Sequence, residues 1–418
     1  MKAILIFVIV IFCIILSAND TFTILGSGAS SNALGYVSLA DMGSPTIISR
    51  NPAALTHVYL NSFSYSFSMN SGTAKYLFPK DVKTKYKTYL CTDFCGIAIP
   101  LNQYKIVIGL SNRLLLDKYF FYEEDAYKED SRGGLRAVTF SVATDLLNLG
   151  DKINFDRNFS LGLNINFLGG GIETTTTHYN HLERDKTYSY SGVSFEAALF
   201  WKALKGMDLG LNIALPYTEK ANIKDKISNE TISRKRNYPI DMNLGAVFYI
   251  NLQRLMYFDI SYQEFSNTTS EINDTKSKDF QFDMLTLKTG FEMQISKKYK
   301  LRFGYAIIPS YKMVYGLQDD PSNNQKKYHT VTSGFCYSID RSSEQNKYLK
   351  WDQFTVNVAA EIQVPQAITD TDNNNCYYSY YEKYFRLSLD ITYGYDTDLF
   401  EIISSGSKKL WNKYITKK

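Results

Sequence analysis

Most of the chain alternates apolar and polar residues with a period of two, which is the pattern of β-strands and not of helices. Residues 353–364 show it most clearly. One face of this segment carries Phe354, Val356, Val358, Ala360, Ile362 and Val364, and the other carries Gln353, Thr355, Asn357, Ala359, Glu361 and Gln363. Residues 385–395 and 159–167 alternate in the same way. Such segments predict strands with an apolar environment on one face and a polar one on the other.

The alternation predicts fourteen strands along the chain. They lie near residues 58–69, 87–99, 103–115, 135–147, 157–169, 187–202, 206–217, 238–250, 254–265, 281–295, 298–309, 328–339, 351–364 and 383–396. Their lengths of about 11 to 15 residues suit a tilted crossing of a bilayer, whereas strands in soluble sheets average about five or six residues.

Long polar connections alternate with short turns between these strands. The long connections include residues 117–134, 220–237, 310–327 and 366–383, and the short turns include 101–103, 203–206, 251–253 and 296–297. This plan is typical of outer-membrane barrels, which have long loops outside and short turns in the periplasm. A soluble β-sandwich or β-propeller is the alternative. It is disfavoured because the apolar rows end in aromatic residues, as at membrane interfaces: Trp201, Tyr217, Tyr249, Tyr262, Tyr393 and Tyr395.

The predicted fold is therefore all-β: a closed, 14-stranded antiparallel transmembrane β-barrel over residues 58–396. Closure follows because an unpaired strand edge in hydrocarbon leaves its backbone groups without hydrogen bonds. The polar rows then face the lumen and carry charges that include Lys288, Arg302 and Arg386. Eight strands enclose only the room that side chains can fill. Fourteen strands predict a lumen that holds water, a ligand or a plug.

The two ends of the chain do not share this pattern. Residues 1–18 combine Lys2, an apolar run and the small residues Ser17 and Ala18, which predicts a signal peptide for export. Residues 397–418 place several apolar residues beside lysines after the last strand. They predict a C-terminal periplasmic tail, which either lies as a helix at the membrane interface or is frayed.

Residues 19–57, between the signal and the first strand, do not alternate and are rich in glycine, serine and small apolar residues. This composition predicts a compact plug, or hatch, inside the lumen. Asn51, Pro52 and Ala53 form its clearest motif. Asn accepts a hydrogen bond at the start of a helix, and Pro fits the first helical position, where its missing N–H removes no hydrogen bond. The small Ala53 lets this turn approach the barrel wall.

Residues 26–55 contain a series of short motifs: Ala33-Leu34-Gly35, Ala40-Asp41, Arg50-Asn51-Pro52-Ala53 and Leu55. The series resembles the N-terminal hatch of the FadL/TodX family of outer-membrane transporters and that of the related PorV-type barrels. The resemblance implies a fourteen-stranded barrel in the bacterial outer membrane, with the hatch in its lumen, that carries long-chain fatty acids and other hydrophobic compounds. The chain departs from the family pattern at Met42, where the family has a second acidic residue.

The barrel and the resemblance together predict hatch-gated diffusion of hydrophobic compounds, such as long-chain fatty acids, through the lumen. The candidate ligand-binding residues are Leu34 and Leu55 in the hatch and Lys288, Arg302 and Arg386 in the wall, where a cation could meet a carboxylate. The alternative for these cations is pairing with Glu292, Glu361 and Asp390. The expected partners are hydrophobic small molecules and outer-membrane lipids. The alternative function is that of a PorV-like docking or shuttle partner of a protein secretion system.

Composition argues against other classes of function. The net charge of +4 is spread without a basic block, so nucleic acid is not an expected partner. The chain has four histidines and no recognisable nucleophile motif, so it is not predicted to be an enzyme. His178 and His181 could bind a metal, but they lie in a threonine-rich loop, and no metal or cofactor is expected.

Overall fold

The computed structural model describes residues 28–77, 81–85, 89–101, 104–117, 120–124, 127–146, 159–178, 181–272, 274–278, 283–310, 326–340, 353–364, 368–371 and 377–395. The predicted signal peptide and the predicted C-terminal tail lie outside the described residues. None of the described helices is long and apolar enough to cross a membrane.

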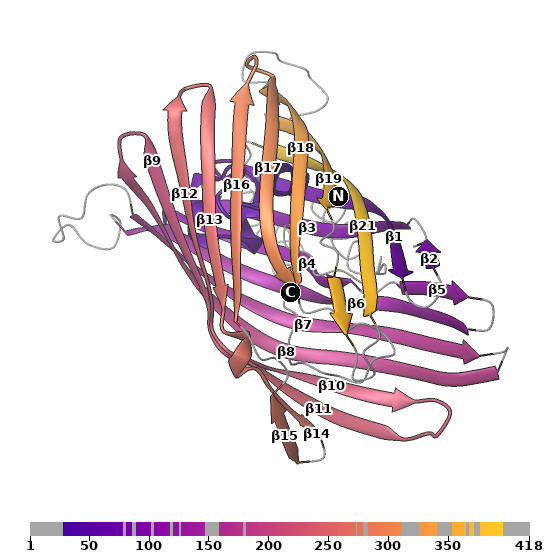
Figure 1. Cartoon of the computed structure of the whole chain (residues 1–418). Helices are drawn as coiled ribbons and strands as arrows, with labels where there is room; N and C mark the ends of the chain where they lie inside the picture. The colour runs from indigo at the N-terminus through magenta and orange to yellow at the C-terminus, as the bar shows by residue number, and fades with distance from the viewer. Residues whose placement is uncertain are drawn as a thin grey trace, which may run out of the picture.

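The strands form one closed antiparallel barrel with fourteen positions (Figure 1), which confirms the predicted fold class. In order around the wall these are β1 (Asn61–Leu77), β3 (Tyr89–Leu101), β4 (Ile106–Asp117), β6 (Tyr127–Asp145), β7 (Phe159–His178), β8 (His181–Leu204), β9 (Met207–Ala214) with β10 (Tyr217–Asp225), β11 (Thr231–Tyr238) with β12 (Asp241–Asn251), β13 (Arg254–Gln263) with β14 (Thr269–Ile272), β15 (Thr275–Lys278) with β16 (Met284–Gln294), β17 (Tyr299–Ser310), β18 (Lys326–Asp340), β19 (Gln353–Val364) and β21 (Tyr377–Tyr395). The short strands β2 (Asp81–Lys85), β5 (Phe120–Glu124) and β20 (Ile368–Thr371) lie in connections. Pairing of β1 with β21, from Asn61–Tyr395 to Leu77–Ser379, closes the ring.

The apolar rows face outward and the polar rows face inward, as the alternation predicts. On β7, Leu163 and Phe167 are 61% and 54% exposed. Asn164 and Asn166, which lie between these two residues in the sequence, are 1% and 0% exposed. The outward row is therefore the surface that a membrane would cover, since burying it in hydrocarbon costs no hydrogen bonds.

The two ends of the barrel differ. One end, here called the turn end, has tight turns, such as those between Leu204 and Met207 and between Asn251 and Arg254, and the barrel begins at Asn61 and finishes at Tyr395 there. At the other end, four consecutive positions of the wall consist of two strands each. Leu215 and Pro216 separate β9 from β10, and Pro239 and Ile240 separate β11 from β12, because proline donates no hydrogen bond to a ladder.

Beyond these breaks the wall changes direction. Figure 1 shows β10, β11, β14 and β15 leaving the barrel along a different line from β9, β12, β13 and β16, and we call these four strands the flare. The sequence predicts a loop over residues 220–237, and this prediction is wrong because β10 and β11 form a hairpin there. β7 and β8 also extend past their predicted ends at residues 169 and 187. These extensions are polar on both faces, so the alternation disappears although the backbone pairing continues.

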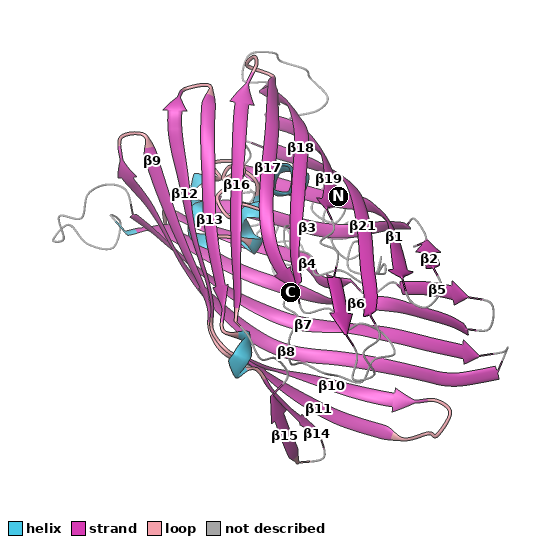
Figure 2. Ribbon diagram, viewed as in Figure 1, coloured by secondary structure: helices cyan, strands magenta, loops and turns pink. Residues whose placement is uncertain are grey.

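An N-terminal segment, Gly28–Val58, lies inside the ring (Figures 1 and 2), and we call it the inner segment. It contains α2 (Ala29–Ala33) and the 3-10 helices η1 (Pro45–Ser49) and η2 (Pro52–His57). The helix α2 contacts β17, β18, β19 and β21, whereas η2 contacts β4, β6, β7, β8 and β9 and η1 contacts β1, β3, β4 and β6. Because these strands lie on different sides of the ring, the inner segment reaches across the lumen.

Candidate functional site

The wall approaches the inner segment through a ring of inward glycines. A Cβ atom added to Gly162 on β7 would lie 2.2 Å from the backbone nitrogen of Ala53. One added to Gly304 on β17 would lie 2.1 Å from the backbone nitrogen of Gly35. We call the set the glycine girdle, and its members are Gly109, Gly162, Gly210, Gly245, Gly290, Gly304 and Gly334. The contact between wall and inner segment is therefore backbone to backbone at several points.

The Asn51-Pro52-Ala53 motif begins η2 against β8. The side-chain oxygen of Asn51 accepts a hydrogen bond of 3.1 Å from the backbone N–H of Ala53. Its side-chain nitrogen donates to the carbonyl of Leu199 at 3.2 Å. Pro52 takes the first helical position, which needs no donor. One side chain thus caps the helix and fastens it to the wall.

An apolar core joins the inner segment to the wall near the turn end. Leu34 and Leu55, two predicted ligand-binding residues, are fully buried in the inner segment, and both lie in this core. The wall supplies Ala98, Val107, Ala143, Ala198, Phe200, Val247 and Tyr257 to the same cluster. The sequence did not predict this core, because it assigned the inward rows to a polar lumen. The sequence did contain a sign of this core, since the inward rows change from polar residues to small or apolar ones toward the turn end.

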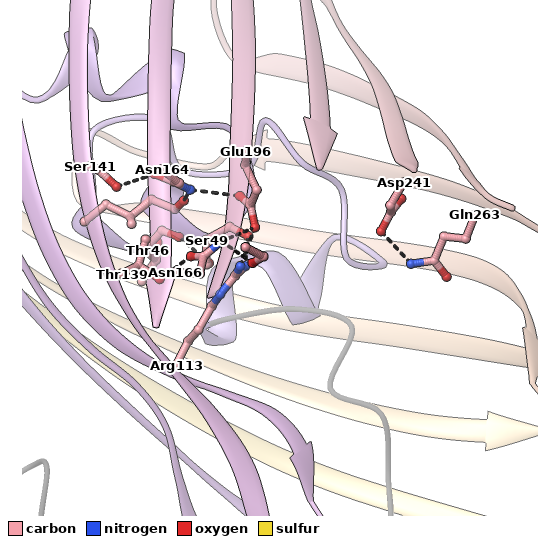
Figure 3. A network of polar contacts seen from close by, with 12 residues as sticks. Thr46, Ser49, Arg113, Thr139, Ser141, Asn164, Asn166, Glu196, Asp241 and Gln263 are labelled. Atoms are coloured by element: carbon pink, nitrogen blue, oxygen red, sulfur yellow. Dashed lines mark hydrogen bonds and ion pairs between the residues drawn. The ribbon is translucent and has the colours of Figure 1, made fainter. Parts of the chain in front are cut away.

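A polar network fixes the end of η1 to β4, β7 and β8 (Figure 3). The carboxylate of Glu196 accepts hydrogen bonds from Arg113 at 2.6 Å and from Asn164 and Asn166 at 2.9 Å each. Arg113 also donates to the carbonyl of Ser49 at 2.6 Å, and Asn164 donates to the carbonyl of Ile48 at 2.9 Å. These contacts satisfy carbonyl groups of η1 that have no partner within so short a helix.

A second polar network runs from β16 to the start of α2. Arg302, a predicted ligand-binding residue, is 2% exposed and pairs with Glu292 at 2.7 Å. It also donates to the side-chain oxygen of Asn357 at 2.6 Å. Asn357 donates to Asp390 at 2.6 Å, and Asp390 accepts the backbone N–H of Ser30 at 3.2 Å. Arg302 therefore belongs to a chain of contacts that holds the inner segment.

The other two predicted cations also contact protein groups. Lys288 is opposite Asp259 in the β13–β16 register and donates to the hydroxyl of Ser261 at 3.0 Å. Asp259 in turn accepts the backbone N–H of Ser38 at 2.5 Å. Arg386 pairs with Asp93 on β3 at 3.0 Å. The structure thus places Lys288, Arg302 and Arg386 in separate groups of contacts.

The inner segment carries a buried cation of its own, Arg50, which sequence reasoning did not single out as a site. Its guanidinium donates to the hydroxyl of Thr46 at 2.8 Å. Burial lowers the pKa of Arg50 to about 10, an effect opposed by the charges of Asp41 and Asp390. Its position directly before the Asn51-Pro52-Ala53 motif is the feature of the sequence that could have identified it. Arg50 adds a positive charge to the middle of the lumen.

Aromatic side chains line the inward face of the wall at the flare. Tyr217 and Tyr238 stack with their ring centroids 4.9 Å apart. Phe265, in the 3-10 helix η4 (Phe265–Asn267) between β13 and β14, meets Tyr238 edge-on at 6.4 Å. Tyr188 and Tyr190 lie on the neighbouring β8, with their centroids 6.4 Å apart. We call these five residues the aromatic wall. Arg234 and Glu219 share this face, with a charged contact of 3.9 Å.

The comparisons with known proteins show the fold. No family model matches the chain, and no curated protein matches its sequence. The structure is similar to that of a FadL homologue from Pseudomonas aeruginosa, with a TM-score of 0.64 and 13% identity over 90% of this chain and 100% of that chain. For the Pseudomonas putida toluene transporter TodX, the TM-score is 0.59 and the identity 11%, over 89% and 99% of the two chains. For the Ralstonia pickettii toluene transporter TbuX, the values are 0.59 and 11%, over 88% and 98%. The fold is therefore the one that the sequence resemblance implied.

Proposed function

We propose that this protein lies in the bacterial outer membrane and lets hydrophobic small molecules diffuse through its barrel, with the inner segment as the hatch. The observation that carries the proposal is the close fit between the inner segment and the glycine girdle. An open porin needs a wide, water-filled lumen, whereas this lumen is crossed by apolar and hydrogen-bonded chain. The similarity to toluene transporters and to a FadL homologue supports the same function.

The aromatic wall is the proposed entry surface. It lies on the flare and beside it, at the end of the barrel opposite the tight turns, which outer-membrane barrels place in the periplasm. Tyrosine rings offer apolar faces to a ligand, and Tyr190 and Tyr217 pack against a buried cluster of Leu135, Ala137 and Leu168. From there a ligand would meet the inner segment, where Leu34 and Leu55 are the proposed contacts once the hatch moves.

Long-chain fatty acids remain the proposed substrates, together with neutral hydrophobic compounds. Lys288, Arg302 and Arg386 all contact protein groups, and this favours internal pairing over the anchoring of a carboxylate. The two roles are separable by changing each cation to Gln and measuring uptake of a labelled C16 fatty acid and of toluene. Loss of fatty-acid uptake alone would identify an anchor, and equal effects on both substrates would identify a structural pair.

The secretion-partner alternative makes a different prediction. A docking barrel should not accumulate lipid ligands, whereas a transporter should retain some of its substrate through purification. Mass spectrometry of lipids extracted with the purified protein distinguishes the two. We expect co-purified fatty acid or another hydrophobic compound. The similar structures include two toluene transporters, and we propose transport in place of catalysis.

Reversible tethering of the inner segment tests the hatch directly. The hydroxyl oxygens of Ser44 and Ser64 are 3.0 Å apart, and so are those of Thr56 and Ser160. Each pair joins the inner segment to the wall, so Ser44→Cys with Ser64→Cys, or Thr56→Cys with Ser160→Cys, should form a disulfide. We expect oxidation to stop uptake and reduction to restore it. The four variants that carry only one of these substitutions are the controls. Full uptake by both oxidised tethers would refute hatch movement.

A further inference from the structure

A row of cations crosses the outward face of the barrel just beyond its apolar belt. The strand registers align seven residues side by side from β6 to β15. They are Arg136, Gly169, Ser191, Lys220, Lys235, Glu271 and Lys276, and we call them the basic rung. Four of the seven are cations and one is an acid, so the row has a net positive charge.

The basic rung continues the lipid-facing row, not the lumen row. On β8 the outward positions include Val193 and Phe195, which are 42% and 49% exposed, and Ser191 is the next outward position. Val193 pairs with Phe167 on β7, which is also exposed. The basic rung therefore lies one step beyond the last large apolar side chains, on the side of the flare. In a membrane this is the level of the lipid headgroups.

The charges of the basic rung are poorly balanced within the protein. Lys220 and Lys235 are directly opposite each other on β10 and β11, and both are exposed. Like charges at directly opposite positions destabilise a strand pair. The single acid of the rung, Glu271, lies 3.5 Å from Lys235. An external anion between the lysines would relieve their repulsion.

The surface beside Lys220 leaves room for such an anion. A Cβ atom added to Gly169 would meet nothing within 4 Å, and its neighbour Ser191 is small. Lys220 is the next member of the rung after Ser191. The guanidinium of Arg136 turns toward β3 and β4, where it donates to the side chain of Asn112 at 2.8 Å and to the carbonyl of Thr92 at 3.1 Å, and its remaining nitrogen is buried. The three lysines therefore supply the charge that faces an external anion.

We infer that the basic rung binds the phosphate groups of an anionic glycolipid in the outer leaflet. This inference rests on the proposed outer-membrane location, because only there does the apolar belt place lipid phosphates at this level. Lysine and arginine near a membrane surface attract anionic lipid, and phosphate accepts several charge-assisted hydrogen bonds. The bound lipid would cover the flare side of the barrel and fix its height in the membrane.

The test measures binding of diphosphoryl lipid A to the full-length protein in detergent, in a variant with Lys220→Gln, Lys235→Gln and Lys276→Gln. We expect the affinity to fall at least about tenfold, and to fall with rising salt in the unchanged protein. Lys205, Lys297 and Lys298 are exposed lysines at the turn end, so changing these three to Gln is the matched control. We expect this control variant to bind as the unchanged protein does.

Further arms identify the source of the phosphate and the role of the charge. Monophosphoryl lipid A should bind more weakly than the diphosphoryl form, and inorganic phosphate alone should compete only weakly. Replacing the same three lysines by Arg should preserve binding. Unchanged affinity in the Gln variant, or an equal loss in the turn-end control, would overturn the inference. Toluene uptake, measured on the same variants, is independent, so a failure of transport with lipid binding intact would count against the proposed function only.

Discussion

The lumen at the inner segment and the lumen at the flare are built from different surfaces. At the inner segment, inward positions of the wall are glycine, alanine or apolar residues, and backbones meet without intervening side chains. At the flare, inward positions are tyrosine, arginine and glutamate. The described residues of the inner segment form no hydrogen bond with these side chains. The first surface suits close packing with the inner segment, and the second suits transient contact with a ligand. One part of the wall therefore packs against the inner segment, and the part at the flare is available to a ligand.

The largest effect should come from breaking the buried ion pair beside α2. Arg302→Met leaves Glu292 without its closest partner and breaks the link through Asn357, so we expect a loss of about 3–5 kcal/mol in the free energy of unfolding. Lys300→Met is the matched control, because Lys300 contacts the same carboxylate but is 37% exposed. It should cost below about 1 kcal/mol. Equal losses, measured by denaturant titration in detergent, would contradict the network described here.

A methyl group added to the glycine girdle should push the inner segment away from the wall. Gly162→Ala places a Cβ atom against the backbone of Ala53, and we expect a loss of about 1–3 kcal/mol together with increased ion conductance in planar bilayers. Gly169→Ala changes a glycine of the same strand that has open space around it. This control should leave both stability and conductance unchanged. A silent Gly162→Ala would show that the inner segment does not need the close approach.

The cap of η2 should have a smaller effect on the same fit. Asn51→Ala removes the cap of η2 and the hydrogen bond to Leu199, so we expect a loss of about 1 kcal/mol and a modest rise in conductance. Asn51→Ser keeps an acceptor for the backbone N–H of Ala53 without burying a charge, and removes the amide donor to the wall. It should lose less stability than the alanine variant. Equal losses in the two variants would show that the wall contact dominates, since both remove it.

An effect on stability similar to that of the cap, together with a clear effect on uptake, is expected at the aromatic wall. Tyr238→Leu removes a ring that stacks on Tyr217, at a cost of about 0.5–1.5 kcal/mol, and should reduce toluene uptake several-fold. Phe248→Leu is the control, because Phe248 forms a comparable aromatic contact with Phe258 on the outward face. Its uptake should be normal. Equal uptake by both variants would remove the entry role of the aromatic wall.

The sequence predicted the architecture because a membrane barrel imposes one simple rule on every strand. Alternation identified the outward row Phe354, Val356 and Val358 and the inward row Thr355 and Asn357, and the structure has both. The extended strands at the flare escaped prediction because both of their faces carry polar residues, so neither Lys220 nor Lys235 stands out in a periodic pattern. Backbone hydrogen bonds to the neighbouring strands hold these segments in the sheet, and the hydropathy of the sequence does not reveal such bonds.

The candidate site was predicted less completely than the wall. The Asn51-Pro52-Ala53 motif is local, and its capping geometry follows from three adjacent residues. The glycine girdle is not local, since Gly162 meets Ala53 and Gly304 meets Gly35 across long stretches of sequence. Glycine inside a strand is a known sign of close backbone approach, so these positions could have been noted. Their partners could not, because only the closed ring brings them together.

Ring closure has a consequence for assembly. The inner segment immediately precedes β1, and β1 completes the ring by pairing with β21, the last described strand. The contact of Gly162 with Ala53 leaves no room even for one methyl group between the wall and the inner segment. We therefore expect the inner segment to be in place before β1 and β21 pair, so that the strands assemble around it.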